Sequence, residues 1–248
     1  MPTVSVILTS HNHGPFLRQA IESVLAQTYT DFELLILDDA STDGSADIAR
    51  EYVGSNAFLQ DYQEKASSLG VVLNRSIRLA RGDYWVWAPS DDVLKPDLLE
   101  KKMATAQEHP GAVLYSDWEY INERGDVTGT KRLPEWTAED IARMVWEKSM
   151  LGFTGIWIPM SVFDEVGNWP THMLFSEDFS WFVRATIHGI PFINCPEVLF
   201  QKRLNPLQTA SKVGTKRILE LVPAIHSELR WYQHLYQQHH PDYEVPSQ

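Results

Sequence analysis

Short apolar runs and helical patterns alternate along the first half of the chain. The predicted β-strands are Val4–Leu8, Phe32–Leu37, Ala57–Tyr62, Tyr84–Ala88 and Ala112–Tyr115. Between them, apolar residues at helical spacing predict helices from Pro15, from Asp43-Gly44-Ser45, over Leu69–Ala80 and from Pro96 to about Gln107. Strands joined by helices of this length form parallel sheets, so we expect an α/β fold with a mostly parallel sheet flanked by helices.

The second half of the chain has a less regular pattern. It predicts a hairpin over Tyr120–Thr130, helices over Thr137–Trp146 and Asp178–His188, a strand over Val198–Lys202, and helix from Lys212 onward, interrupted by Pro223. No internal repeat or low-complexity linker separates the two halves. We therefore expect one domain with a C-terminal helical extension.

Polar clusters follow three of the predicted strands. They are Thr9-Ser10-His11-Asn12, Asp38-Asp39-Ala40-Ser41-Thr42-Asp43-Gly44 and Ser90-Asp91-Asp92. In an open α/β sheet, ligands bind beyond the carboxyl ends of the strands. Because parallel strands end at the same edge, the three clusters should converge there.

The acidic pair Asp91-Asp92 is a candidate metal site. The sequence has no glycine-rich phosphate loop, so a nucleotide diphosphate bound here would meet carboxylates. Carboxylates repel phosphates unless a divalent cation lies between them, and Mg²⁺ or Mn²⁺ is commonly held by one or two carboxylates plus substrate phosphates. The alternative is that the pair caps the helix that begins near Pro96.

The other acidic pair, Asp38-Asp39, suits base recognition. A carboxylate accepts the imide N–H of uracil or thymine, which cytosine lacks, and Thr9 can contribute to the same pocket. Capping of the next helix is again the alternative, since Asp43 and Ser45 already carry capping signals.

Composition narrows the classes of function. The formal net charge of −12 disfavours nucleic-acid binding and electrostatic adhesion to an anionic membrane. One cysteine, Cys195, excludes an intramolecular disulfide and is expected to be a buried thiol. The N-terminus has no signal-peptide pattern, and no stretch approaches the roughly 20 apolar residues of a transmembrane helix. We therefore expect a cytoplasmic protein.

Four segments resemble, in order, the motifs of inverting family-2 glycosyltransferases with the Rossmann-like GT-A fold, and among these the bacterial spore-coat polysaccharide type. They are SVILTSHNHGPFLRQAIESVLAQTYTDFELLILDDASTDGS, LNRSIRLARGDYWVWAPSDDVLKPDLLEKKM, FSEDFSWFVRATIHG and FQKRLNPLQTAS. The resemblance implies a GT-A domain over residues 1–211. Residues 1–115 would form its nucleotide-binding half and 116–211 its acceptor-binding, catalytic-base half, and 212–248 would be a helical extension with a polar tail.

The resemblance also implies roles for individual residues. It assigns Asp178 as catalytic base, Asp92 with Asp91 as metal ligands for Mn²⁺ or Mg²⁺, and a nucleotide-binding set of Thr9, His11, Asp39, Asn74 and Asp91. We place Trp157 and Glu177 in the acceptor pocket. An acidic helix N-terminus that complements the helix dipole is the alternative interpretation of Glu177-Asp178.

The sequence departs from the family pattern at three positions. Pro89 replaces the first aspartate of the acidic motif, Ser76 replaces a glycine, and Asn205 replaces a common histidine. The Gln-x-x-Arg-Trp motif of processive synthases is absent from the last segment, which favours transfer of a single sugar.

The implied reaction is inverting transfer from a UDP- or dTDP-sugar to a hydroxyl of a saccharide or lipid-linked acceptor. Peripheral membrane association is open through the aromatic stretch Leu229–Tyr236, although a helix packed on the domain is the simpler interpretation. A catalytically inactive nucleotide-binding module and a metal-dependent nucleotidyltransferase are the competing functions. The sugar, the acceptor, the linkage and the oligomeric state are open.

Overall fold

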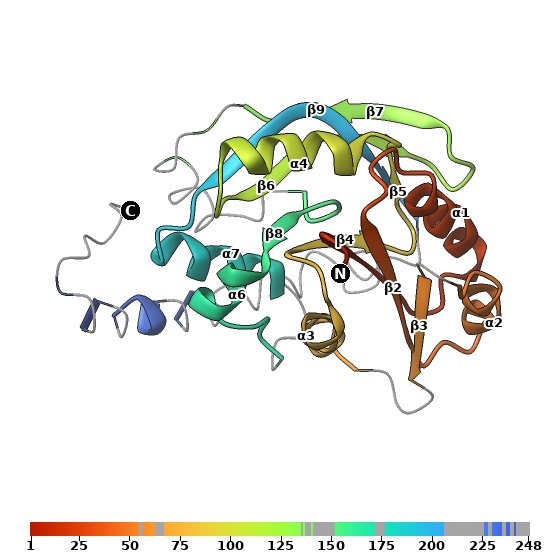
Figure 1. Ribbon diagram of the computed structural model, residues 1–248, viewed down its shortest axis with the longest axis horizontal. Coiled ribbons are helices and arrows are strands. Elements are labelled where there is room, and N and C mark those ends of the chain that lie inside the picture. Colours follow the sequence, from red (N-terminus) through yellow and green to blue (C-terminus); the bar gives the residue numbers. More distant parts are fainter. Residues whose placement is uncertain are drawn as a thin grey trace.

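The computed structural model describes residues 1–54, 57–62, 67–134, 136, 140, 152–171, 177–205, 226–227, 230–234, 237–238 and 241 (Figure 1). The strands are β1 (Val4–Ser10), β2 (Phe32–Asp39), β3 (Ala57–Tyr62), β4 (Tyr84–Pro89), β5 (Val93–Leu94), β6 (Val113–Ile121), β7 (Val127–Lys131), β8 (Trp157–Pro159) and β9 (Phe192–Arg203). The helices are α1 (Gly14–Leu25), α2 (Ser45–Arg50), α3 (Leu69–Leu79), α4 (Leu98–Glu108), α6 (Met160–Val166) and α7 (Glu177–Ile187).

The described strands form one mixed sheet in the order β3-β2-β1-β4-β8-β6-β9-β5, with β7 paired to β6. β1 pairs in parallel with β2 on one side and with β4 on the other, and β2 pairs in parallel with β3. β6 and β9 are also parallel, whereas β8 runs antiparallel to both β4 and β6. The predicted α/β fold with a mostly parallel sheet is confirmed for these strands.

Helices cover both faces of the sheet. α4 lies on one side of β4 and β8, and α3 and α6 lie on the other (Figure 1). Every residue of β1 and β2 is buried. Because these strands have no solvent-facing side, their sequences are nearly continuous apolar runs, which is why they were predictable.

Shorter or more polar elements differ from the prediction. β6 continues beyond the predicted end at Tyr115 to Ile121, because its polar residues are paired with β9 and β7. β5, β8 and α6 were not predicted. β5 and β8 contain only two and three residues and α6 contains seven, and such short elements carry too little periodicity to be recognised. α4 begins at Leu98, two residues after Pro96, with Asp97 at its N-cap position.

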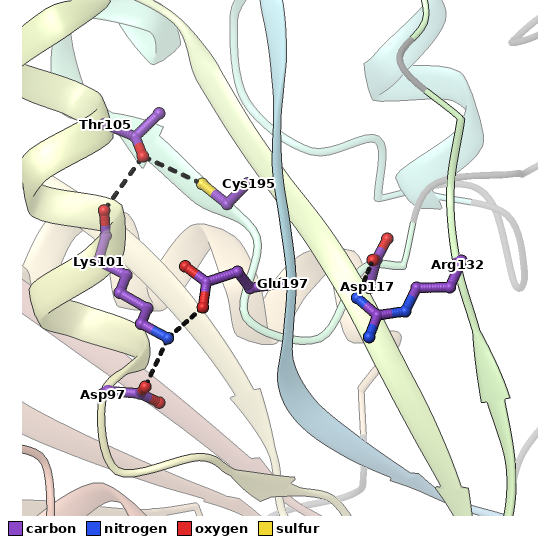
Figure 2. Close-up of polar contacts among 7 residues, drawn as sticks. All are labelled: Asp97, Lys101, Thr105, Asp117, Arg132, Cys195 and Glu197. Carbon is purple, nitrogen blue, oxygen red and sulfur yellow. Dashed lines mark hydrogen bonds and ion pairs between the residues drawn. The ribbon is translucent and has the colours of Figure 1, made fainter.

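β9 contains an irregularity that ties it to α4. Its register with β6 shifts between the pairs Ser116–Cys195 and Asp117–Val198. Beside this shift, Lys101 of α4 forms ion pairs with both Glu197 and Asp97 (Figure 2). The buried Cys195 thiol donates to Thr105 Oγ1 at 3.4 Å. The thiol is structural, as expected.

The predicted helix over Thr137–Trp146 and most of the predicted extension from residue 212 lie outside the described residues. Within the described part of the extension, the Tyr232 hydroxyl is 2.7 Å from His188 Nε2, so this residue packs against the end of α7. Among the described residues, no helix is both long and apolar enough to cross a membrane.

Candidate active site

The loops that follow β1 and β2 are hydrogen-bonded to each other. Asn12 has a positive φ of 56°, a conformation that asparagine tolerates better than most residues. Its backbone N–H donates to Ser41 Oγ at 2.9 Å, and its side-chain oxygen accepts from the Thr42 N–H at 2.8 Å. His11 Nδ1 lies 2.7 Å from the carbonyl oxygen of Asp39.

The loop that follows β4 joins the same surface. His13 Nδ1 is 2.9 Å from Ser90 Oγ, and the Ser90 N–H donates to the carbonyl oxygen of Thr9 at 3.1 Å. The indole N–H of Trp87 donates to Thr9 Oγ1 at 3.1 Å. The three polar clusters therefore converge at one edge of the sheet, as expected from the strand order.

Asp38 and Asp39 have different environments. Asp38 is fully buried and accepts from the N–H and the hydroxyl of Ser41, at 2.9 and 2.8 Å, so it closes its own turn. Asp39 accepts from Ser67, through the backbone N–H at 2.7 Å and the hydroxyl at 2.8 Å. Arg75 Nη1 lies 3.7 Å from Asp39 Oδ1. Asp39, Ser67 and Arg75 thus form a polar cluster beside Thr9 and His11.

Asp91 and Asp92 are both buried at the end of β4. Asp92 Oδ2 accepts from the Thr154 hydroxyl at 2.5 Å, and Oδ1 accepts from the Arg203 backbone N–H at 2.8 Å. Asp91 Oδ2 accepts from the Asn205 side-chain amide at 3.1 Å. Burial, and then repulsion by Asp91, raise the pKa of Asp92 to about 7.

This pair has the chemistry of a divalent-cation site. The described residues contain no group of three or more His, Cys, Asp or Glu that could enclose a metal unaided. Mn²⁺ or Mg²⁺ bound with a nucleotide needs only one or two carboxylates, because phosphate oxygens supply further ligands. Burial and the neighbouring Asp91 disfavour the ionised form of Asp92, and a cation would offset both effects, so the residues present fit the predicted ion.

Arg203 fixes the acidic pair relative to the rest of the sheet. Its buried guanidinium donates from Nε to the carbonyl oxygen of Asp91 at 2.9 Å and from Nη1 to that of Asn122 at 2.8 Å. It also donates from Nη2 to Gln19 Oε1 at 2.6 Å. Burial lowers the pKa of Arg203 from its ordinary value. Arg203 therefore joins the ends of β4, β6 and β9 to α1.

Asp178 and Glu177 begin α7. Asp178 is partly exposed, and its Oδ1 accepts from the Phe179 N–H at 2.8 Å. Glu177 is only 5% exposed and packs beside Gly70, where an added Cβ would meet the Pro170 carbonyl oxygen at 2.1 Å. Burial, and secondarily the neighbouring Asp178, raise the pKa of Glu177 to about 7. Of the two acids, Asp178 is the one in contact with solvent.

A chain of aromatic rings connects β4 with α7. Ring centroids lie 4.1 Å apart for Trp87 and Phe153, 5.1 Å for Phe153 and Trp169, and 4.8 Å for Trp169 and Trp181. Trp87 also contacts Thr9, and Trp181 lies one turn after Asp178. The helix that carries Asp178 is therefore packed on the same core as the strands that carry the nucleotide-side residues.

Two predicted site residues, Asn74 and Trp157, have buried contacts with other parts of the chain. The Asn74 amide accepts from the Trp169 N–H and donates to the Trp169 carbonyl oxygen, both at 2.9 Å, so its hydrogen bonds join α3 to the segment before α7. Trp157 is fully buried in β8 and packs on Tyr84 at 4.8 Å. Its ring therefore packs in the core, and its assignment to a pocket wall stays a prediction.

Several residues at the site were not singled out from the sequence. Arg75 and Ser67 lie in or before a helix whose pattern indicated only amphipathicity. Thr154 is 62 residues from its partner Asp92. Arg203 lies in the segment FQKRLNPLQTAS, but its contacts are visible only in the structure. Arg75 could have been noticed because it follows Asn74 directly in the sequence. The long-range pairs could not have been found from any local sequence pattern.

Comparisons with known proteins agree with this geometry. Residues 5–167 match the family model described as glycosyl transferase family 2. An uncharacterized glycosyltransferase of Rickettsia prowazekii is 27% identical over 216 residues, which cover 85% of this chain and 66% of that protein. Chondroitin synthase of Escherichia coli is 35% identical over 100 residues, 40% of this chain and 15% of the synthase. The chain thus spans at most about two thirds of these relatives.

Solved structures share the fold. S. aureus TarS 1–349 in complex with UDP-GlcNAc matches with a TM-score of 0.70 and 19% identity over 91% of this chain and 66% of that one. The mannosyltransferase PcManGT from Pyrobaculum calidifontis, in complex with GDP-Man and Mn²⁺, matches with a TM-score of 0.65 and 16% identity over 94% of this chain and 70% of that one. The fold is therefore that of GT-A glycosyltransferases, and the matched family model, which covers more than half of the residues, places the chain in glycosyl transferase family 2.

Proposed function

We propose that this glycosyltransferase transfers a single sugar from a UDP- or dTDP-sugar to a hydroxyl acceptor, by inverting displacement with Asp178 as general base. The observation that carries the proposal is the hydrogen-bonded convergence of the loops after β1, β2 and β4. This surface places the cluster around Asp39 and the pair Asp91-Asp92 at one sheet edge. A nucleoside diphosphate has the two matching groups, a base and a charged diphosphate.

The nucleoside end of the donor is assigned to the cluster around Asp39. The carboxylate of Asp39 accepts the imide N–H of uracil or thymine, and the guanidinium of Arg75, 3.7 Å from Asp39 Oδ1, is proposed to donate to a base carbonyl. Thr9 and His11 flank this cluster from the end of β1. Cytosine presents no imide N–H, so the cluster selects against cytidine nucleotides.

The diphosphate end is assigned to Asp91 and Asp92, which would hold Mn²⁺ or Mg²⁺. When bound, the ion would neutralise the charge of the departing diphosphate. Arg203 holds the Asp92 carboxylate through its backbone N–H and the Asp91 carbonyl oxygen through its guanidinium, and Asn205 donates to the Asp91 carboxylate. TarS and PcManGT, the neighbours solved with UDP-GlcNAc and with GDP-Man and Mn²⁺, support a nucleotide-sugar donor and a divalent ion.

Asp178 is proposed to take the proton of the acceptor hydroxyl as that oxygen attacks the anomeric carbon. A positioned general base accelerates such a step about 10²- to 10⁴-fold. Glu177, buried beside it, is proposed to border the acceptor subsite. We propose a saccharide or lipid-linked acceptor and a cytoplasmic location, with residues 1–115 binding the donor and 116–211 supplying the acceptor side.

A panel of nucleotide-sugars with Mn²⁺ tests the donor class. Ligands that bind the native state raise its unfolding temperature, so UDP- or dTDP-sugars should stabilise the protein, whereas CDP-linked compounds should not. An equal rise in unfolding temperature for compounds of every base would show that the Asp39 cluster does not select the base.

The variant Asp178→Asn tests the base once a stabilising donor is found. It should reduce donor turnover by about 10²-fold or more, because asparagine cannot accept the proton. UDP affinity should stay at the wild-type value, since Asp178 is assigned to the acceptor hydroxyl and makes no proposed contact with the nucleotide. Near wild-type turnover in this variant would show that Asp178 is not the base.

A further inference from the structure

The hydrogen bond from Thr154 to Asp92 crosses between distant parts of the chain. Thr154 and Asp92 are both buried, and the hydroxyl meets Oδ2 at 2.5 Å. The other oxygen, Oδ1, accepts from the backbone N–H of Arg203 at 2.8 Å. Each carboxylate oxygen has two acceptor positions, so one protein donor at each oxygen fixes the orientation of the group and leaves room for a cation.

The segment that carries Thr154 is held in place on both sides. The Gly155 N–H donates to the carbonyl oxygen of Trp87 at 2.7 Å, and the backbone N–H of Trp87 donates to the carbonyl oxygen of Ile156 at 3.3 Å. The ammonium group of Lys102, fully buried on α4, donates to the carbonyl oxygen of Gly155 at 2.6 Å. The backbone next to the hydroxyl is therefore fixed by a strand and by a helix.

Glycines make this close approach possible. Gly155 has a positive φ of 68°, and an added Cβ there would lie 2.8 Å from a methyl carbon of Leu98. An added Cβ at Gly152 would meet the rings of Phe200 and Trp118 at 2.8 and 2.9 Å. Substitution at either position would displace the segment, so the hydroxyl reaches Asp92 only because the backbone lies this close to its neighbours.

From these contacts we infer that Thr154 is a positioning residue that orients Asp92 for the divalent cation and so sets the affinity of the protein for that cation. The inference rests on the proposed function, in which Asp92 holds the ion. The neutral hydroxyl donates to the carboxylate without adding a positive charge that would compete with the ion. Partners of this kind, which contact a metal ligand and not the metal, typically change metal affinity about 10- to 100-fold when removed.

The test measures UDP binding by calorimetry at a series of Mn²⁺ concentrations and in EDTA. The variant Thr154→Val keeps the shape of the side chain and removes the hydroxyl, and Thr154→Ala serves if valine does not fold. Thr154→Ser keeps the donor. Thr105→Val is the matched control, because Thr105 is a hydrogen-bonded threonine on α4 outside the site (Figure 2).

Thr154→Val should need about 10- to 100-fold more Mn²⁺ for half of its effect on UDP affinity, and its UDP affinity in EDTA should match that of the wild type. Thr154→Ser should need the same Mn²⁺ concentration as the wild type for half of its effect on UDP affinity. The control Thr105→Val should also need the wild-type concentration. An unchanged Mn²⁺ requirement in Thr154→Val, or an equal loss of UDP affinity in EDTA, would overturn the inference and leave the proposed function intact. Absence of UDP binding in the wild type with Mn²⁺ would overturn the proposed function and the inference with it.

Discussion

Asp39 accepts two hydrogen bonds from Ser67 and lies beside Arg75, whereas both carboxylate oxygens of Asp38 accept hydrogen bonds from Ser41. Neighbouring residues with the same side chain therefore have different environments, because successive side chains of β2 point to opposite faces of the sheet. The sequence shows only an acidic pair. The different tasks of its two members follow from Ser67 and Arg75, which arrive from the segment before α3 and from α3 itself.

The variant Asp39→Asn should reduce the preference for UDP over CDP. In the proposed contact the carboxylate would accept the imide N–H, and hydrogen bonds to charged groups contribute about 1.5–3 kcal/mol. The affinity for UDP should fall about tenfold or more, while the weak affinity for CDP should change little. Calorimetric titration of both nucleotides measures the ratio, and a ratio equal to that of the wild type would contradict base recognition by Asp39.

The variant Asn74→Ala should lower stability more than nucleotide affinity. It leaves the buried N–H and carbonyl groups of Trp169 without the amide that bonds both, at a cost of about 1–3 kcal/mol for each unsatisfied group. We expect a fall of several degrees in the thermal midpoint and UDP affinity within about threefold of the wild type. A large loss of UDP affinity at an unchanged midpoint would instead support a direct contact between Asn74 and the nucleotide.

Among the elements, β1, β2, β4 and α7 were predictable from local pattern, whereas β8, α6 and the second half of β6 were not. β1, β2 and β4 are apolar runs followed by polar clusters, so the order of elements was enough to predict convergence at one edge. β8 and α6 together contain ten residues, and β6 carries the polar residues Ser116 and Asp117 in its middle. Their places in the sheet depend on pairing with distant strands, which local periodicity does not encode.

The same limit applies to the contacts around Asp92. Its partners Thr154 and Arg203 are 62 and 111 residues away in the chain. No spacing rule connects these positions, because a crossover through β8 and another through β9 bring them together. Asp92 was predictable as an acid at the end of a strand, and the residues that orient it were not.

α4 carries a buried lysine whose charge should make stability depend on pH. Burial lowers the pKa of Lys102 from 10.5 to about 8. Between these values the unfolded chain keeps a proton that the folded protein has lost, so this group raises the free energy of unfolding as pH rises from about 8 to 10.5. Below about pH 8 the protein carries the full cost of the buried charge.

The variant Lys102→Met should remove this dependence. The difference in unfolding free energy between wild type and variant should shift toward the wild type by up to a few kcal/mol from about pH 8 to 10. Urea unfolding at several pH values measures it. Lys101→Met is the matched control, because Lys101 is ion-paired at the surface of the same helix and its pKa is raised. A constant difference across this range would show that the pKa of Lys102 is not lowered on folding and that the folded protein keeps this proton, as the unfolded chain does.

For the whole molecule, the fold couples two halves through one core. The aromatic rings from Trp87 to Trp181 join the strands at the nucleotide side to the helix of Asp178, and Arg203 joins β9 to the acidic pair. A donor held at Asp39 and Asp92, as proposed, would therefore be fixed relative to Asp178. The chain spans at most about two thirds of the relatives described.

We propose that the converging loops bind a uridine nucleotide through Asp39 at the base and through a cation at Asp91-Asp92. The decisive measurement is calorimetric titration of the wild-type protein with UDP, in Mn²⁺ and in EDTA. We expect a single site whose affinity is about tenfold or more higher in Mn²⁺, since two buried carboxylates repel a diphosphate unless a cation lies between them. Equal affinity under the two conditions, or no binding in Mn²⁺, would contradict it.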